Sequence, residues 1–217
     1  ALAFLGELEA AEEVLKRTEN SIAPYFQELS KSDGGWPEGI GYWNFGMSYG
    51  VYYLLSWEKT FLKKHPLFRI PALRKSLHFP IDFCPRGVPS SFGDSNRWVP
   101  QPFHYLLAER LQDFSVFQAL NPLLDASCLH FGWWDRTTEF LMAYRPPETD
   151  GLESVSKVRS RHYRGMDWAI LADQLPNPHL YLAIRGGTTE VKHGHLDLMS
   201  YQLVLEDEAM VVNLGMN

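Results

Sequence analysis

This sequence of 217 residues has little cysteine, no long apolar run and no excess of positive charge. Its 2 cysteines, Cys84 and Cys128, can form at most one bridge, which excludes a disulfide framework and leaves the redox compartment open. No apolar stretch approaches the roughly 20 residues of a membrane span. Residues 1–5 lack the basic flank and the length of a signal peptide. The net charge of −6 argues against a protein whose surface follows nucleic acid.

Helical periodicity dominates the first two-thirds of the sequence. Apolar residues recur at helical spacing over 4–15, and Pro24 is expected to interrupt this helix, so that Ser21 begins a second one. The connection 85–102 is rich in Gly, Ser, Pro and Asn, and loops of this length are often functional. Further helices are expected over 42–64, 71–79, 102–112, 114–121 and 135–144.

After a linker at 146–151, the pattern changes to short strands separated by turn signals. Helices followed by strands indicate an α+β protein with segregated domains, which we place at 1–150 and 151–217. About 60 residues of strand pattern are too few for a β-sandwich, which usually takes about 100. We therefore interpret the chain as a fragment of a longer protein. The expected strands are 155–164, 167–172, 179–186, 190–196, 198–206 and 209–213.

The sharpest chemical signal is His193-Gly194-His195, which falls in the expected strand 190–196. On a strand, residues two apart point to one face, about 7 Å from each other. His193 and His195 could therefore share a metal, or one could bind metal while the other contacts substrate. A solvated polar strand face explains the pattern equally well. A metal-binding cupin is disfavoured, because no glutamate follows within the next few residues.

A glycine-rich loop and the start of the following helix hold a second cluster, made of Trp36, Glu38, Tyr42 and Trp43. Large flat side chains beside a carboxylate are typical of a wall that binds saccharides. The glycines allow tight turns, and Pro37 restricts the backbone between them. Core packing is the favoured interpretation for the aromatic residues further along this helix, namely Tyr49, Tyr52 and Tyr53.

A basic stripe lies in the first expected strand. Lys157, Arg159 and Arg161 share strand parity within an otherwise acidic chain. The stripe could bind carboxylates or sulfates of an anionic polysaccharide. An exposed charged strand face, without a ligand, is an equally good explanation.

Two of these motifs together resemble the heparinase II/III family of polysaccharide lyases. They are Asp-Gly-Gly-Trp-Pro-Glu-Gly-Ile-Gly-Tyr-Trp at 33–43 and the Lys-His-Gly-His-Leu-Asp-Leu-Met-Ser-Tyr region within 186–201, followed by Val-Val-Asn-Leu-Gly at 211–215. The family includes heparin, heparan and alginate lyases and, more distantly, dermatan-type uronyl epimerases. The resemblance implies an incomplete α/α toroid followed by an antiparallel β-sandwich, with a groove between them. It also implies a periplasmic or secreted protein.

The resemblance implies roles for individual residues. Tyr42 matches the catalytic tyrosine and His193 the catalytic histidine of the second domain, whereas His195 matches a ligand of zinc or manganese. Asn213 stands where the family usually has a metal-binding aspartate, and a neutral amide oxygen is the weaker ligand. A structural metal is therefore expected to bind weakly or not at all. Trp36, Glu38 and Trp43, with the two arginines Arg159 and Arg161, are the expected substrate-binding residues.

The implied activity is β-elimination on a glycan that contains uronic acid. The reaction removes the weakly acidic C5 proton, and a tyrosine can serve as base only if nearby cations stabilise its phenolate. His193 can act as the partner base because histidine titrates near neutrality. A uronyl C5-epimerase and a catalytically inactive carbohydrate-binding relative remain the alternatives. The expected partner is an anionic polysaccharide or oligosaccharide.

Overall fold

The computed structural model describes residues 1–90, 92–94, 98–121, 159–206 and 208–214. Within these ranges the protein is α+β, with helices up to Leu120 followed by a five-stranded antiparallel sheet. The expected domain boundary at 150/151 and the expected helix at 135–144 lie outside the described residues. Among the helices that are described, none is long and apolar enough to cross a membrane.

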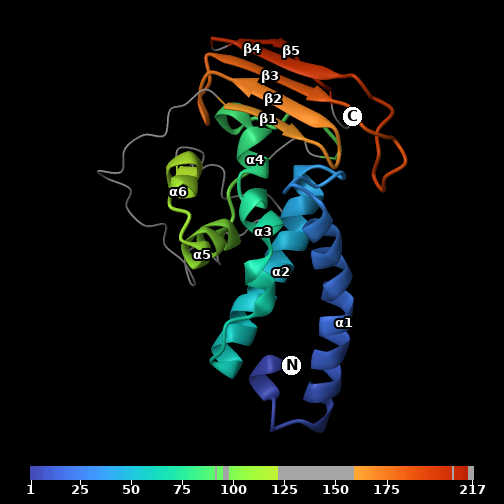
Figure 1. Cartoon of the computed structure of the whole chain (residues 1–217), viewed down its shortest axis with the longest axis vertical. Coiled ribbons are helices and arrows are strands. Elements are labelled where there is room, and N and C mark those ends of the chain that lie inside the picture. The colour runs from blue at the N-terminus through green and yellow to red at the C-terminus, as the bar shows by residue number, and fades with distance from the viewer. Residues whose placement is uncertain (91, 95–97, 122–158, 207, 215–217) are drawn as a thin grey trace.

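Two long helices, α1 (Glu9–Lys31) and α2 (Ile40–Phe61), run side by side away from the sheet (Figure 1). Glycines on α2 allow the close approach, because a Cβ atom on Gly46 or Gly50 would press against the ring of Tyr25 or Phe26 of α1. The expected helix over 42–64 is confirmed as α2. Of its aromatic residues, Tyr52 and Tyr53 pack against the core, but Tyr49 is 58% exposed, so its core assignment is wrong.

Helix α1 continues through Pro24, so the expected break at this residue is wrong. Proline removes one backbone donor and leaves the carbonyl of Asn20 without its usual helical partner. Both Pro24 and Asn20 are exposed, so water can hydrate this carbonyl. Phe26 and Leu29, one turn further on, are buried against the rest of the core and hold the helix in register.

Shorter helices lead from α2 towards the sheet and along its side. The expected helices over 102–112 and 114–121 are confirmed, whereas the expected helix over 71–79 ends at Ser76 and a turn separates it from a further helix that begins at Phe79. In Figure 1, α4 lies directly beneath the sheet, while α5 and α6 pack beside α3 and α4. The elements are α3 (Pro71–Ser76), α4 (Phe79–Asp82), α5 (Pro102–Leu111) and α6 (Ser115–Leu120), with 3-10 turns at Leu2–Phe4, Pro66–Arg69 and Pro85–Gly87.

The sheet is a meander in which each strand pairs with the next one along the chain. The expected strands at 167–172, 179–186 and 209–213 are confirmed, 198–206 is confirmed from Tyr201 onward, and 155–164 is confirmed over its described part. The expected strand at 190–196 is wrong, because these residues form turns. The strands are β1 (Arg159–Tyr163), β2 (Trp168–Ala172), β3 (Leu180–Arg185), β4 (Tyr201–Leu205) and β5 (Glu208–Val211).

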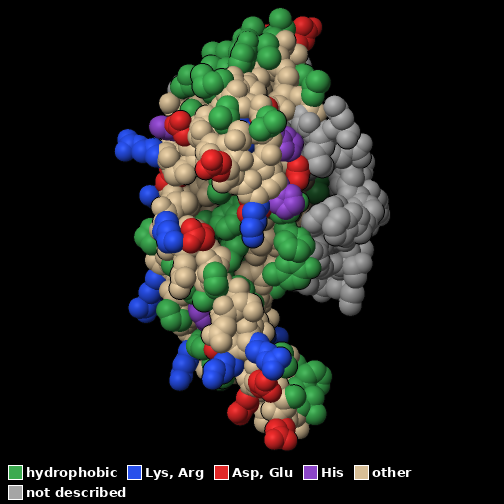
Figure 2. Space-filling model, turned by 90° about the vertical axis from the view of Figure 1, so that its right-hand side faces the viewer, with side chains coloured by type: hydrophobic (Ala, Val, Ile, Leu, Met, Phe, Trp, Pro, Cys, Tyr) green, Lys and Arg blue, Asp and Glu red, His purple; other side chains and the backbone are tan. Residues whose placement is uncertain are grey.

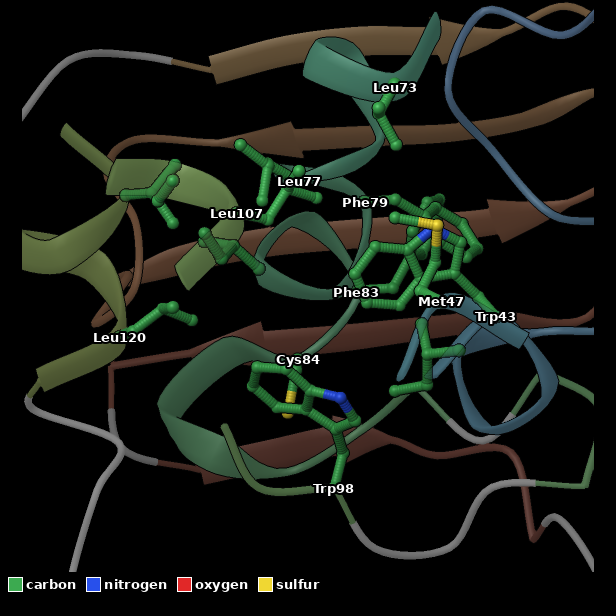
Figure 3. Packing of buried hydrophobic residues seen from close by; sticks show 14 of the residues in the cluster. Trp43, Met47, Leu73, Leu77, Phe79, Phe83, Cys84, Trp98, Leu107 and Leu120 are labelled. Carbon is green, nitrogen blue, oxygen red and sulfur yellow. The ribbon is translucent and has the colours of Figure 1, made fainter. Parts of the chain in front are cut away.

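Aromatic side chains join the inner face of the sheet to the helices. The ring of Phe79 lies edge-on to that of Tyr163 at 5.4 Å, and Phe83 contacts Trp168 at the same centroid distance. Figure 3 shows Phe79 and Phe83 beside Trp43 and Met47 of α2 in this core. Each buried aromatic side chain stabilises the fold by roughly 1.5–3 kcal/mol, so the sheet and the helices share one hydrophobic core.

The opposite face of the sheet is also apolar, and much of it is exposed. Leu171, Leu180 and Met210 are 51%, 49% and 56% exposed. Figure 2 shows hydrophobic side chains gathered at the end of the molecule where the sheet lies. The sheet is therefore apolar on both faces, as expected of a strand layer that packs on two sides.

Candidate functional site

Two loops cross at the beginning of α2, and this crossing places Asp94 beside Tyr42. Gly39 and Gly93 both adopt positive φ, at 93° and 83°. A Cβ atom on Gly39 would lie 2.6 Å from the carbonyl oxygen of Phe92, and one on Gly93 would lie 2.8 Å from that of Glu38. Only glycine fits both the conformation and the space. Helix α2 thus begins with its first turn against the loop that carries Asp94.

Tyr42, His193 and Asp94 form a compact triangle of polar atoms. The Tyr42 hydroxyl lies 2.9 Å from Nδ1 of His193 and donates to Oδ2 of Asp94 at 3.4 Å. The same Nδ1 lies 3.2 Å from Oδ2 of Asp94. The phenol and imidazole rings are stacked at a centroid distance of 3.9 Å. The hydroxyl and Nδ1 are therefore within hydrogen-bond distance of each other.

Asp94 also holds the second histidine of the motif. Its Oδ1 lies 2.7 Å from Nε2 of His195, so the two carboxylate oxygens bind different imidazoles. The histidines reach Asp94 from turns, with His193 at a φ of 54°. Gly194 between them has no room for a side chain, since a Cβ atom would lie 2.6 Å from the carbonyl oxygen of Thr189. A tight turn, and not the expected strand face, thus brings both histidines to Asp94.

The electrostatic environment of Tyr42 differs from the expected one. Burial and then the negative charge of Asp94, together with its hydrogen bond and the charge of Glu38, raise the pKa of Tyr42 above its ordinary value. Tyr42 is therefore a neutral phenol at physiological pH. We expected cations that stabilise a phenolate, and the structure instead places two carboxylates beside the hydroxyl. This arrangement suits a proton donor.

His193 has one ring nitrogen available to a ligand. Its side chain is 44% exposed, and Nδ1 is engaged by Tyr42 and Asp94. Among the described residues, none forms a hydrogen bond with Nε2. If Nδ1 carries the proton and donates a hydrogen bond to Asp94, the lone pair of the neutral imidazole is on Nε2. His193 is therefore arranged as a base that takes its proton at Nε2.

The other expected ligand-binding residues lie in different places. Trp36 is half-buried and packs on Tyr25 at a centroid distance of 4.6 Å, while Glu38 is near enough to Tyr42 to raise its pKa. Trp43 is completely buried and stacks on the imidazole of His104, so it leaves no surface for a substrate. Residues i and i+1 of a helix face different directions, which is why Tyr42 reaches the site and Trp43 does not.

The two arginines of the expected basic stripe turn inward, and its third member, Lys157, lies outside the described residues. Nε of Arg159 lies 2.6 Å from Oδ1 of Asp82, a carboxylate with no exposed surface, and Arg161 pairs with Oδ2 at 3.4 Å. Tyr163 donates to the same Oδ2 at 2.7 Å, and Tyr181 donates to the backbone carbonyl of Asp82 at 2.9 Å. Because inner-face positions of β1 meet α4, the two arginines tie the sheet to the helices and are not placed on an open binding face.

The expected metal ligands His195 and Asn213 are both engaged by other groups. Nε2 of His195 is bound to Asp94. The Asn213 amide donates to Oδ2 of Asp197 at 2.5 Å and to Oγ of Ser200 at 3.0 Å. In the part of the chain that the structure describes, no group of three or more His, Cys, Asp or Glu side chains is arranged to hold a metal ion.

Sequence reasoning missed Asp94 and Arg185. The length and composition of the loop at 85–102 was the available signal for Asp94. Arg185 gave no such signal, because a single arginine at the end of a strand pattern is usually exposed. A comparison with models of known protein families found no match, and a search of curated proteins also found none.

Proposed function

We propose that this protein is a polysaccharide lyase that cleaves a uronic-acid-containing glycan by β-elimination. The cluster of Tyr42, His193 and Asp94 is the observation that supports this function. It combines an available imidazole nitrogen, a carboxylate partner and a neutral phenol within hydrogen-bond distance of one another. Elimination needs these parts: a base for the C5 proton and an acid for the leaving oxygen at C4.

In the proposed reaction, Nε2 of His193 takes the C5 proton, and Asp94 stabilises the imidazolium through Nδ1. The electron pair left at C5 forms the C4–C5 double bond as the C4–O4 bond breaks, and the Tyr42 hydroxyl gives its proton to O4. The positive imidazolium at 2.9 Å makes this donation easier, because it stabilises the phenolate that forms. The Nε2 proton of the partly exposed His193 is then released to water and the Tyr42 oxygen takes a proton from water, which restores the Nδ1-protonated imidazole and the phenol.

A lyase explains this geometry better than an epimerase does. An epimerase must return the proton to the opposite face of the sugar, which needs acid and base on two sides. Here the rings of Tyr42 and His193 are stacked at 3.9 Å, so both groups serve one side. The same geometry favours a uronate whose C5 hydrogen and C4 oxygen lie on one face, as in glucuronate and mannuronate.

The proposal also includes the arrangement of the domains and the class of substrate. The described helices form part of an incomplete α/α toroid, and the sheet forms one layer of an antiparallel β-sandwich. The apolar outer face of the sheet, with Leu171 and Leu180 half exposed, supports this arrangement. The substrate is an anionic polysaccharide, and the resemblance implies a periplasmic or secreted protein.

Matched polymers that differ only at C5 test this proposal. We expect the full chain to release unsaturated uronate, followed by its ultraviolet absorbance, from polymannuronate or a glucuronate polymer. Polyguluronate and iduronate polymers should react at least about tenfold more slowly, since their C5 hydrogen lies on the other face from O4. If no polymer of either class produces the absorbance, the lyase proposal is contradicted. If polyguluronate or an iduronate polymer reacts faster, the one-sided mechanism is contradicted.

A further inference from the structure

A buried guanidinium lies behind the turn that carries the two histidines. Arg185 is the last residue of β3 and is only 1% exposed. Its guanidinium carbon lies 5.8 Å from the centre of the Trp168 ring. A buried arginine needs a compensating negative charge, because desolvation of an unpaired cation is costly. Its partner is Asp197, which lies on the turn itself.

Arg185 holds the segment 195–200 at several points. Its side chain forms an ion pair with Asp197. Its Nη1 group also donates to the backbone carbonyl of His195 at 3.2 Å. Its backbone carbonyl accepts from the Met199 amide at 2.8 Å, and its own amide donates to the Ser200 carbonyl at 3.0 Å. Arg185 thus holds the turn through an ion pair, a side-chain hydrogen bond and two backbone hydrogen bonds.

The residues that would hold a metal do not converge on one ion. A carboxylate can only accept hydrogen bonds, so the Asn213 amide turns its NH2 group towards Asp197 at 2.5 Å. Nε2 of His195 faces Asp94 at 2.7 Å. The positive charge beside Asp197 is that of Arg185. The negative charge that a metal would neutralise is already paired with a protein cation.

We propose that Arg185 is a positioning residue that orders the turn at 193–200 in place of a bound metal ion. It thereby fixes the directions in which His193 and His195 meet Asp94. The ordering of the turn is independent of the proposed lyase activity, and only its effect on turnover rests on that activity. The test therefore uses readouts that need no substrate.

The test compares Arg185→Lys and Arg185→Gln with the matched control Arg110→Lys in the full chain. Arg110 also pairs with a carboxylate, that of Glu58 at 2.7 Å, and its guanidinium also lies over an aromatic ring, that of Phe68. Within the described part of the chain, Arg110 has no hydrogen bond or ion pair with the turn. Hydrogen exchange at the Met199 and Ser200 amides and imidazole nitrogen NMR signals of His193 and His195 report on the turn.

We expect exchange at these two amides to rise about tenfold or more in Arg185→Lys, with shifted imidazole signals of both histidines. A larger change is expected in Arg185→Gln, and none at the turn in Arg110→Lys. Wild-type protein titrated with zinc or manganese alone should show no added protection of the turn. Unchanged exchange in Arg185→Lys, or stoichiometric metal uptake by the wild type with added protection of the turn, overturns the proposal.

Discussion

Asp94 is the residue that connects the other groups of the candidate site. Its Oδ1 binds His195 at 2.7 Å and its Oδ2 lies 3.2 Å from His193, so it orients both imidazoles. It also contributes to the raised pKa of Tyr42, after the effect of burial. Asp94 therefore orients the base and adds to the effect of burial in raising the pKa of the acid.

We expect Asp94→Asn to reduce kcat by about 10²–10⁴-fold, because an amide cannot stabilise the imidazolium of His193. Removing the negative charge should also lower the pKa of Tyr42. The alkaline limb of the pH–rate profile, where the phenol loses its proton, should therefore move to lower pH. Steady-state kinetics across pH, with NMR of labelled tyrosine, measures both effects.

The control for this substitution is Asp173→Asn. Asp173 also pairs with a histidine, since its Oδ2 lies 3.1 Å from Nδ1 of His179, but it lies at the β2–β3 turn. The Asp173→Asn substitution should leave both kcat and the alkaline limb of the pH–rate profile unchanged. An Asp94→Asn enzyme with wild-type kcat would remove Asp94 from the mechanism.

At the scale of elements, the crossing of two loops aligns the start of α2 with the loop that carries Asp94. Gly39 and Gly93 contact the opposite backbone and both need positive φ. The crossing brings the backbone next to Tyr42 against the backbone next to Asp94. The site therefore depends on backbone geometry as much as on its catalytic groups.

We expect Gly93→Ala to lower the free energy of unfolding by roughly 2 kcal/mol or more and to reduce kcat, since the new methyl group forces the two loops apart. Gly6→Ala is the matched control. Gly6 has a φ of 82°, close to the 83° of Gly93, but a Cβ atom there meets nothing within 4 Å. It should cost only about 1 kcal/mol, from the backbone alone, with kcat unchanged. Denaturant unfolding measures the free energy of unfolding of both variants. An equal decrease in Gly93→Ala and Gly6→Ala would mean that the two loops are not tightly packed where they cross.

The elements that the sequence predicts well are those with strong periodicity. Helix α2 and strands β2 and β3 follow their expected ranges closely. The failures have local causes that periodicity does not contain. An exposed Pro24 is tolerated inside α1, and positive φ at His193 and Met199 makes turns of a segment with strand-like alternation.

At the scale of the whole molecule, a buried carboxylate attaches the sheet to the helices. Asp82 at the end of α4 binds Arg159 and Arg161 of β1 and accepts from Tyr163. This contact brings the 193–200 turn, which follows the sheet strand β3, to the beginning of α2. The sequence predicted the order of helices and strands and that Tyr42 and His193 belong to one site. It could not predict the contact itself, because Asp82 belongs to no motif and the basic stripe that includes Arg159 predicted either a ligand-binding face or a solvated one.

Turnover by Tyr42→Phe is the most direct test of the account. We predict that the full chain forms unsaturated uronate from polymannuronate or a glucuronate polymer, and that Tyr42→Phe lowers kcat by about 10²–10⁴-fold with little change in thermal stability. Tyr53→Phe is the matched control, because the Tyr53 hydroxyl also donates to a carboxylate, that of Glu19 at 3.3 Å, but lies about three turns further along α2. It should retain wild-type kcat. A Tyr42→Phe protein that matches the wild type in this assay would contradict the central claim that Tyr42 supplies the proton for the leaving group.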